Sequence, residues 1–385
     1  MAVTSGRGVA SGRADGDVQS GRNNNDVSQR EDLANFISMI TRDETPLMSD
    51  FGKTKATSIF HEWQTDSLNA PGDSRLVEGT DFVVPTGATS PVANDQTGLV
   101  PAQDNDPAGT STGAQYAIVG PHRTRLGNYA QINGKSIAIS GTRRTIDQAG
   151  VADEYAYQLK KRGTELRRDV EADLVGTNAA SGTGRRQFGG YQSFINVDSA
   201  NTDAGAQFGT VVYAGSGHTA ATNQGTGRSA PAANTTAADR GSLSLSDIDE
   251  VMQRIYQEGG KATKIMLSPK LRRDFSDLMV TDSGVRRNID MDGKLRQSVD
   301  VYMSDFGDLM VVPNYVMGLT VAGSGVVADS AAFIYDPQWF NIATLRPLQE
   351  VDIGQRGDST VGMMVEECTL EVRNPIGCGA IYNLS

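Results

Sequence analysis

Residues 69–121 constrain the fold most, because they hold six of the chain's thirteen prolines among Gly, Asp, Asn and Thr. They separate two strand-like stretches, one over residues 58–68 and one over residues 129–139. A structureless loop of this length is unusual inside a compact domain. We therefore expect a large hairpin that projects from the body and is held by something outside the subunit.

The charge balance favours a soluble protein. The 385 residues include 35 basic and 46 acidic side chains, a net charge of -11. This balance opposes a purely electrostatic nucleic-acid binder, since that affinity comes from Lys and Arg on phosphates. The chain has no apolar run typical of a signal peptide or a transmembrane helix, so we expect no membrane contact. Its two cysteines, Cys368 and Cys378, are expected to be free thiols in a reducing cytoplasm.

Two features are predicted before the hairpin. Residues 1–30 are Gly, Ser, Arg, Asp and Asn with almost no large apolar side chain, which predicts a mobile arm. A short amphipathic helix is expected to follow and to be broken at Pro46. Its apolar positions, at i, i+3, i+4 and i+7, are Leu33, Phe36, Ile37 and Ile40.

The clearest helix is predicted over residues 153–176. Gly176 stands where a helix would end. Gly163 inside the helix costs about 1 kcal/mol relative to Ala, which favours a close packing contact there. One apolar stripe runs along it, made of Tyr155, Leu159, Leu166, Val170 and Leu174.

Residues 196–242 are rich in Gly, Ala, Thr, Asn and Ser, which indicates a surface insertion. A compact α/β unit is expected next. It begins with a helix that Ser246 caps and that Gly259 and Gly260 end; its apolar face is expected to hold Ile248, Val251, Met252, Ile255 and Tyr256. A buried strand KIMLS, a helix capped by Ser268 with Pro269 in its first turn, and a hairpin complete the unit. Two long β stretches then flank a turn at Gly357.

Four short motifs resemble functional signatures but are explained by local structure. The GKT at residues 52–54 and the GKS at 134–136 lack the glycine that a phosphate loop needs five residues earlier, where Leu47 and Tyr129 stand. The DFG at 305–307 has none of the accompanying kinase motifs and is expected to be a hairpin turn. The RGD at 356–358 is expected to be a β-turn.

The stretch IFHEWQTDSL, residues 59–68, is the remaining candidate for chemistry. His61, Glu62 and Asp66 could form a metal site or an acid/base pair. However, the chain has three histidines in all, and HEW lacks the HExxH spacing of zinc enzymes. On a strand, His61 and Trp63 would share one face and Glu62 the other. We expect a structural role, with no catalytic, cofactor-binding or metal-ligating residue.

The chain resembles the major head proteins of tailed bacteriophages of the SU-ten type over roughly residues 31–385. The resemblance rests on an ordered series of segments: DETPLMSDFGK, FHEWQTDSL, VEGTDF, NGKSIAISGT, DEYAYQLKKRGTELRRDVEADLVG, SDFGDLMVVPN, DPQWFNIATLRPLQE and VEECTLEVRN. It implies an α+β chain with the Hong Kong 97-type capsid fold. His61, Glu62 and Asp66 would then be contacts within or between subunits.

The resemblance also implies a division of the chain. The expected parts are an N-terminal arm (1–57), an extended-loop hairpin (58–140), a peripheral domain with a spine helix (141–195), a surface insertion (196–242), an axial domain (243–325) and C-terminal strands that return to the peripheral domain (326–385). Some shells of this fold form Lys–Asn crosslinks from the extended loop. Residues 69–121 contain no lysine, which argues against that chemistry here.

The expected function is that of a structural protein that assembles as pentamers and hexamers into an icosahedral head in the host cytoplasm. The implied partners are further copies of the chain, a portal protein, a decoration protein and packaged double-stranded DNA contacted non-specifically. The arm before the matched region is short, so a separate scaffold protein is expected. Two alternatives stay open: a self-assembling surface or adhesin protein outside a capsid, and a hydrolase that uses His61 and Asp66.

Overall fold

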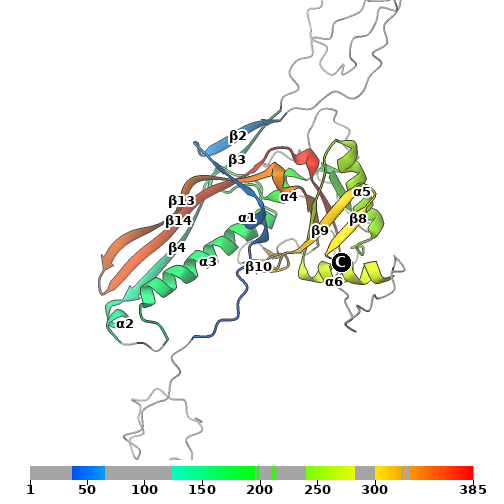
Figure 1. Ribbon diagram of the computed structural model, residues 1–385. Helices are drawn as coiled ribbons and strands as arrows, with labels where there is room; N and C mark the ends of the chain where they lie inside the picture. Colours follow the sequence, from blue (N-terminus) through cyan, green and yellow to red (C-terminus); the bar gives the residue numbers. More distant parts are fainter. Residues whose placement is uncertain are drawn as a thin grey trace, which may run out of the picture.

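The computed structural model describes residues 37–65, 124–146, 148, 150–195, 197–198, 210–213, 240–281, 300–321, 325–326 and 330–384. The predicted mobile arm, the excursion over residues 69–121 and most of residues 196–242 lie outside the described residues. The described chain mixes helices and strands and has two principal sheets (Figure 1).

The first principal sheet has four strands in the order β1-β13-β14-β4. Strand β1 runs parallel to β13, and the other neighbours are antiparallel. The turn between β13 and β14 contains Gly357, whose φ of 62° suits glycine and explains the RGD triplet as a hairpin turn. The strands are β1 (Gly52–Lys55), β4 (Gln131–Ser140), β13 (Phe340–Arg356) and β14 (Ser359–Val372).

Helix α3 (Glu154–Val175) lies along this sheet, as Figure 1 shows. Asp153 caps it by accepting a hydrogen bond from the Tyr155 N–H. The predicted stripe is confirmed for Leu166, Val170 and Leu174, which are buried, whereas Tyr155 and Leu159 are half-buried. The predicted close contact at Gly163 is also confirmed: a Cβ there would lie 3.2 Å from Cε of Met364 on the sheet.

The second principal sheet has seven strands in the order β5-β6-β15-β12-β7-β9-β8. The DFG turn joins β8 to β9, as predicted. The strands are β5 (Val197–Asp198), β6 (Thr210–Tyr213), β7 (Lys264–Leu267), β8 (Val301–Ser304), β9 (Gly307–Pro313), β12 (Ala332–Tyr335) and β15 (Gly379–Tyr382).

Two hydrophobic clusters cover the two faces of the seven-stranded sheet. One face packs against helices α5 (Leu245–Gln257) and α6 (Pro269–Thr281). The other face packs together with α3 and the four-stranded sheet around a hydrophobic cluster that is centred on aromatic rings. Its rings include Phe51, Tyr191, Phe333, Tyr335 and Phe340. The two sheets therefore share one core.

A third, two-stranded sheet pairs β2 (Phe60–Thr65) antiparallel with β3 (Thr124–Tyr129), and we call this pair the hairpin base. The prediction paired residues 58–68 with 129–139, so its second strand was wrong. Residues 131–140 form β4 and pair with β14 instead, because alternate residues such as Ile137 and Ile139 are buried in the four-stranded sheet. The remaining elements are short. They are α1 (Pro46–Asp50), α2 (Gly141–Thr145), α4 (Tyr191–Phe194), β10 (Thr320–Val321), β11 (Gly325–Val326) and two 3-10 turns, Pro337–Trp339 and Pro375–Gly377.

Helix caps follow the sequence with one correction. Ser268 caps α6, accepting from the Leu271 N–H, as predicted. Helix α5 is capped by Ser244, which accepts from the Asp247 N–H, so the prediction of Ser246 was wrong by two residues. Tyr256 is 63% exposed because it lies about 100° around the helix from buried Ile255.

The predicted helix over residues 33–40 is wrong in its described part. Residues 37–45 have no regular structure, and Ile37 and Ile40 are exposed. A helix this short is unstable in water unless it packs on something, and here the apolar side chains meet no core. Pro46 begins α1 instead of breaking a helix, which suits its fixed φ and missing N–H.

Two expected boundaries differ from the observed strands. Residues 196–242, expected as a surface insertion, contribute β5 and β6, and β6 pairs parallel with β15. Short strands of two and four residues are easily missed within a Gly- and Thr-rich stretch. Residues 326–385 were expected to return to the peripheral domain as strands. Of strands β12 to β15, β13 and β14 join the four-stranded sheet, whereas β12 and β15 belong to the seven-stranded sheet.

Candidate assembly site at the base of the hairpin

The β2–β3 pair places the candidate residues on opposite faces, as the alternation predicted. His61 and Trp63 are half-buried, while Glu62 is exposed. Glu62 lies 3.8 Å from Arg125 of β3 in an exposed ion pair. Asp66 lies outside the described residues.

His61 bonds to a carboxylate on the longest antiparallel pair of the body. Its Nε2 lies 3.0 Å from Oε2 of Glu371 on β14, and Arg373 Nε donates to the other oxygen at 3.1 Å. Partial burial acts to raise the pKa of Glu371, but hydrogen bonds from His61 and Arg373 outweigh it, so this pKa lies below its ordinary value. The carboxylate is therefore held charged as a structural anchor.

Two further side chains fix the hairpin base to the body. The Trp63 ring lies 5.9 Å from that of Phe194, at the margin of the main core. Asn128 of β3 is fully buried, and its amide donates to the carbonyls of Leu370 at 2.8 Å and Gly189 at 3.1 Å. Its side-chain oxygen accepts from the Gly189 N–H at 2.8 Å. Every polar atom of this amide is thus used.

Sequence reasoning missed Asn128, Glu371 and Arg373. Asn128 carried a usable signal, because asparagine is depleted in strands and is rarely buried without a specific hydrogen-bonding role. Glu371 and Arg373 carried none, since an alternating strand pattern gives the face of a residue but not its partner on a distant strand.

A second buried carboxylate fixes the segment that precedes β1. Glu171 of α3 is fully buried and accepts from the N–H groups of Leu47 and Met48, each at 3.0 Å, and from the Asn314 amide at 2.7 Å. Burial raises its pKa, although these three hydrogen bonds act in the opposite direction. The N-terminal segment, α3 and the end of β9 therefore meet at one side chain.

Within the described ranges, no group of three or more His, Cys, Asp or Glu side chains is placed to hold a metal ion. Both cysteines are free and buried, as predicted for free thiols, and burial raises the pKa of each thiol. A thiol held neutral in this way is a poor nucleophile. No helix in the described part of the chain is long and apolar enough to cross a membrane.

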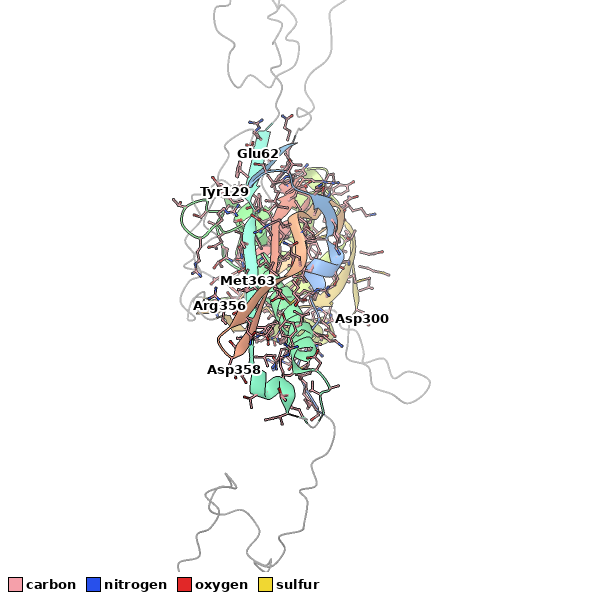
Figure 2. The ribbon with its side chains drawn as sticks, turned by 90° about the vertical axis from the view of Figure 1, so that its left-hand side faces the viewer. Glu62, Tyr129, Asp300, Arg356, Asp358 and Met363 are labelled. Atoms are coloured by element: carbon pink, nitrogen blue, oxygen red, sulfur yellow. The ribbon has the colours of Figure 1, made fainter. Side chains whose placement is uncertain are left out.

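The hairpin base and the β13–β14 turn lie at opposite ends of the four-stranded sheet. In Figure 2, Glu62 and Tyr129 mark one end, Arg356 and Asp358 mark the other, and Met363 lies between them. The remaining motif fragments, GKT and GKS, lie on β1 and β4 as ordinary strand residues. The site is therefore a set of structural contacts that fix the β2–β3 pair and the segment before β1 to the body.

Comparisons with known proteins agree in pointing to one kind of assembly. The family model of the SU10 major capsid protein matches residues 18–385. The major capsid protein of Escherichia phage Phieco32 is 23% identical over 387 residues, which cover 91% of this chain and 93% of that protein.

Three solved structures share the fold. The capsid of cyanophage A-1(L) has a TM-score of 0.57 at 10% identity, covering 92% of this chain and 97% of that one. The mature capsid of bacteriophage PhiM1 gives 0.52 at 10% identity, with 92% and 91% covered. The capsid of cyanophage P-SCSP1u gives 0.51 at 11% identity, with 93% of each chain covered. At these identities the likeness establishes the fold alone.

Proposed function

The chain belongs to the SU10 major capsid protein family, and from this premise we propose that it assembles as pentamers and hexamers into an icosahedral head that encloses double-stranded DNA. Its fold is the Hong Kong 97-type capsid fold, as its sequence suggested. It is a structural component of a phage shell and hence of the virion. The family implies a non-enzymatic role, and assembly in the host cytoplasm is part of the proposal.

We propose the following division of labour. Residues 1–57 form the arm, 58–140 the extended-loop hairpin, 141–195 the peripheral domain and 243–325 the axial domain. Residues 326–385 serve both domains, because β13 and β14 extend one sheet while β12 and β15 complete the other. Residues 196–242 lend β5 and β6 to the axial sheet.

The fixed position of the β2–β3 pair supports this proposal most. His61, Trp63 and Asn128 hold the pair to the core at the point where residues 66–123 connect its two strands. The sequence of residues 69–121 is polar and proline-rich and predicts no core of its own, so we propose that contacts on another copy of the chain order it.

The four-stranded sheet supplies a surface for such contacts. Val351, Met363 and Ser136 are register partners across β13, β14 and β4, on the face opposite α3. Val351 is 37% exposed, and Ile132 and Gly134 on the same face of β4 are also exposed. Exposed small and apolar residues on a sheet face suit an extended segment laid across it. In the proposal, this face receives the hairpin of a neighbouring subunit.

We propose three further partners for such a shell. A closed shell filled with DNA needs a portal protein at one vertex, and we propose a separate scaffold protein and a decoration protein as further partners. The axial and peripheral domains supply contacts between copies.

Negative-stain electron microscopy of the purified chain, with and without co-expressed scaffold, tests the proposal. We expect rings or closed shells from the wild type and from Glu62→Ala, which removes an exposed side chain of the hairpin. Trp63→Ala, which loosens the hairpin base, should reduce their yield. Dispersed monomers under every condition would contradict the proposal.

A further inference from the structure

Five exposed basic side chains lie on the side of the four-stranded sheet that carries α3. We call this surface the basic face. They are Lys53 and Lys55 of β1 and Lys160, Lys161 and Arg167 of α3. In the part of the chain that the structure describes, none of the five has a carboxylate oxygen within 4.0 Å. Nearby Lys135 and Arg162 are instead paired, with Asp169 and Glu165. Three acidic side chains lie on the same side of the sheet: exposed Glu350 and Asp352 of β13, beside Tyr155 of α3, and half-buried Glu366. Five unpaired basic side chains against these three leave a local excess of positive charge on a chain of net charge -11.

The regular geometry of the two elements aligns four of these charges in two pairs, whereas Lys161 lies about 100° around α3 from Lys160. Lys160 and Arg167 are one heptad apart, so they lie within about 20° of each other around α3. Lys53 and Lys55 are two residues apart on β1 and so share one face of the sheet. Glu366 of β14 connects the two sets: both Arg167 and Lys53 act to lower the pKa of its half-buried carboxyl, although burial raises it.

The side chains around these charges indicate which kind of polyanion can bind to the basic face. None of the large apolar side chains exposed in the described ranges lies on α3 or β1. A protein partner normally needs such apolar or aromatic anchors for affinity. Single-stranded nucleic acid normally stacks its bases on exposed aromatic rings, and none is exposed on these two elements. A duplex needs only cations that reach its phosphates.

We propose that the basic face binds the phosphates of double-stranded DNA without reading sequence. The proposal rests on the chain being a shell subunit, and it names the surface that meets the packaged duplex. The acidic balance elsewhere keeps that contact weak and local, because the remaining surface repels the same phosphates. The binding should accordingly depend steeply on salt.

Fluorescence anisotropy of a labelled duplex of mixed sequence, titrated with the full-length chain at 50 mM and 200 mM salt, tests this. The double variant Lys160→Glu/Lys161→Glu reverses two charges and keeps good helix formers on exposed positions. We expect at least about tenfold weaker binding at 50 mM salt, and a slope of log affinity against log salt that is shallower by about two. The matched control is Lys261→Glu/Lys270→Glu, which reverses two exposed charges on the other sheet's side. It should change affinity by less than about twofold.

A variant that is expected to bind DNA more tightly controls for loss of binding through misfolding. Glu366→Gln removes the negative charge between Arg167 and Lys53, so it should tighten DNA binding by on the order of twofold. A misfolded protein would not show that gain.

DNA binding and shell formation are measured separately, so a failure of this inference can be distinguished from a failure of the proposed function. Electron microscopy of the same preparations reports shell formation, which we expect both double variants to retain. Equal loss of affinity in the two double variants, or no binding by the wild type at 50 mM salt, would overturn the inference while leaving the shell intact. It would also be overturned if Lys160→Glu/Lys161→Glu bound DNA like the wild type but failed to assemble with scaffold, since the basic face would then dock a protein.

Discussion

The imidazole of His61 lies 3.0 Å from the carboxylate of Glu371, although 310 residues separate them in sequence. The bond joins β2 to β14, which is one of the two central strands of the four-stranded sheet. Arg373 holds the same carboxylate from the other side. The histidine that first suggested a metal site is therefore a structural joint in this chain.

Replacing His61 should test that role directly. His61→Ala leaves a largely buried charge with one partner fewer, which typically costs about 1–3 kcal/mol of unfolding free energy. Chemical denaturation should show this loss. Glu62→Ala is the matched control: its ion pair with Arg125 is exposed, so it should change little.

The metal content of the same two proteins gives an independent readout. We expect both variants and the wild type to contain no stoichiometric metal. Zinc that is bound by the wild type and lost in His61→Ala would contradict the structural assignment.

The stability that Glu371 contributes should depend on pH in one direction. Its pKa in the folded chain lies below the ordinary value of 4.5, so folding favours its charged form. This contribution is fully present above about pH 4.5 and is lost as the pH falls through the lowered pKa. The difference in unfolding free energy between the wild type and Glu371→Gln should therefore shrink below pH 4.5. A difference that grows on acidification would refute the sign.

Trp63 should matter through its ring and not through its N–H. Removing a fully buried aromatic ring costs about 3–5 kcal/mol, and Trp63→Ala should cost less because the ring is only partly buried. The indole nitrogen is buried with no hydrogen-bond partner in the described part of the chain, so Trp63→Phe should cost less than about 1 kcal/mol. Thermal unfolding of the two variants compares them, and equal losses would show that the ring is not the important group.

Two glycines near α3 should respond oppositely to alanine. At Gly163 a Cβ would meet the flexible end of Met364 at 3.2 Å, and the helix would gain about 1 kcal/mol in propensity. At Gly362 a Cβ would lie 2.0 Å from the Tyr155 hydroxyl oxygen, whose hydrogen bond to Glu350 would have to break. We expect Gly163→Ala to be neutral or stabilising and Gly362→Ala to be destabilising. Denaturant midpoints that fall for both would contradict the contact at Gly163.

The sequence predicted those features that are encoded by local patterns of residues. The helix at 154–175, the opposite faces of His61 and Glu62, and the turns at Gly307 and Gly357 all follow from periodicity and turn chemistry. The composition of residues 69–121 predicted a hairpin after residues 58–68, but its second strand is β3 at 124–129 and not the expected stretch 129–139. These features involve neighbours in sequence or a single closed hairpin.

What the sequence could not predict depends on distant partners. Glu171 meets the amides of Leu47 and Met48 across more than 120 residues, and nothing in its helix marks it as buried beyond its place near the apolar stripe. The helix predicted at 33–40 shows the converse in its described part, residues 37–40. Its apolar spacing was correct, but the fold offers Ile37 and Ile40 no surface to pack against.

We propose that residues 66–123, which connect β2 to β3, join one subunit to the next. Limited trypsin digestion of assembled and unassembled chains from one preparation tests this proposal, with Arg75 and Arg123 as cleavage sites at the two flanks of the proline-rich excursion. We predict rapid cleavage there in unassembled subunits and resistance in particles, because contacts formed on assembly would shield these sites. Equal cleavage rates in the two states would contradict the claim.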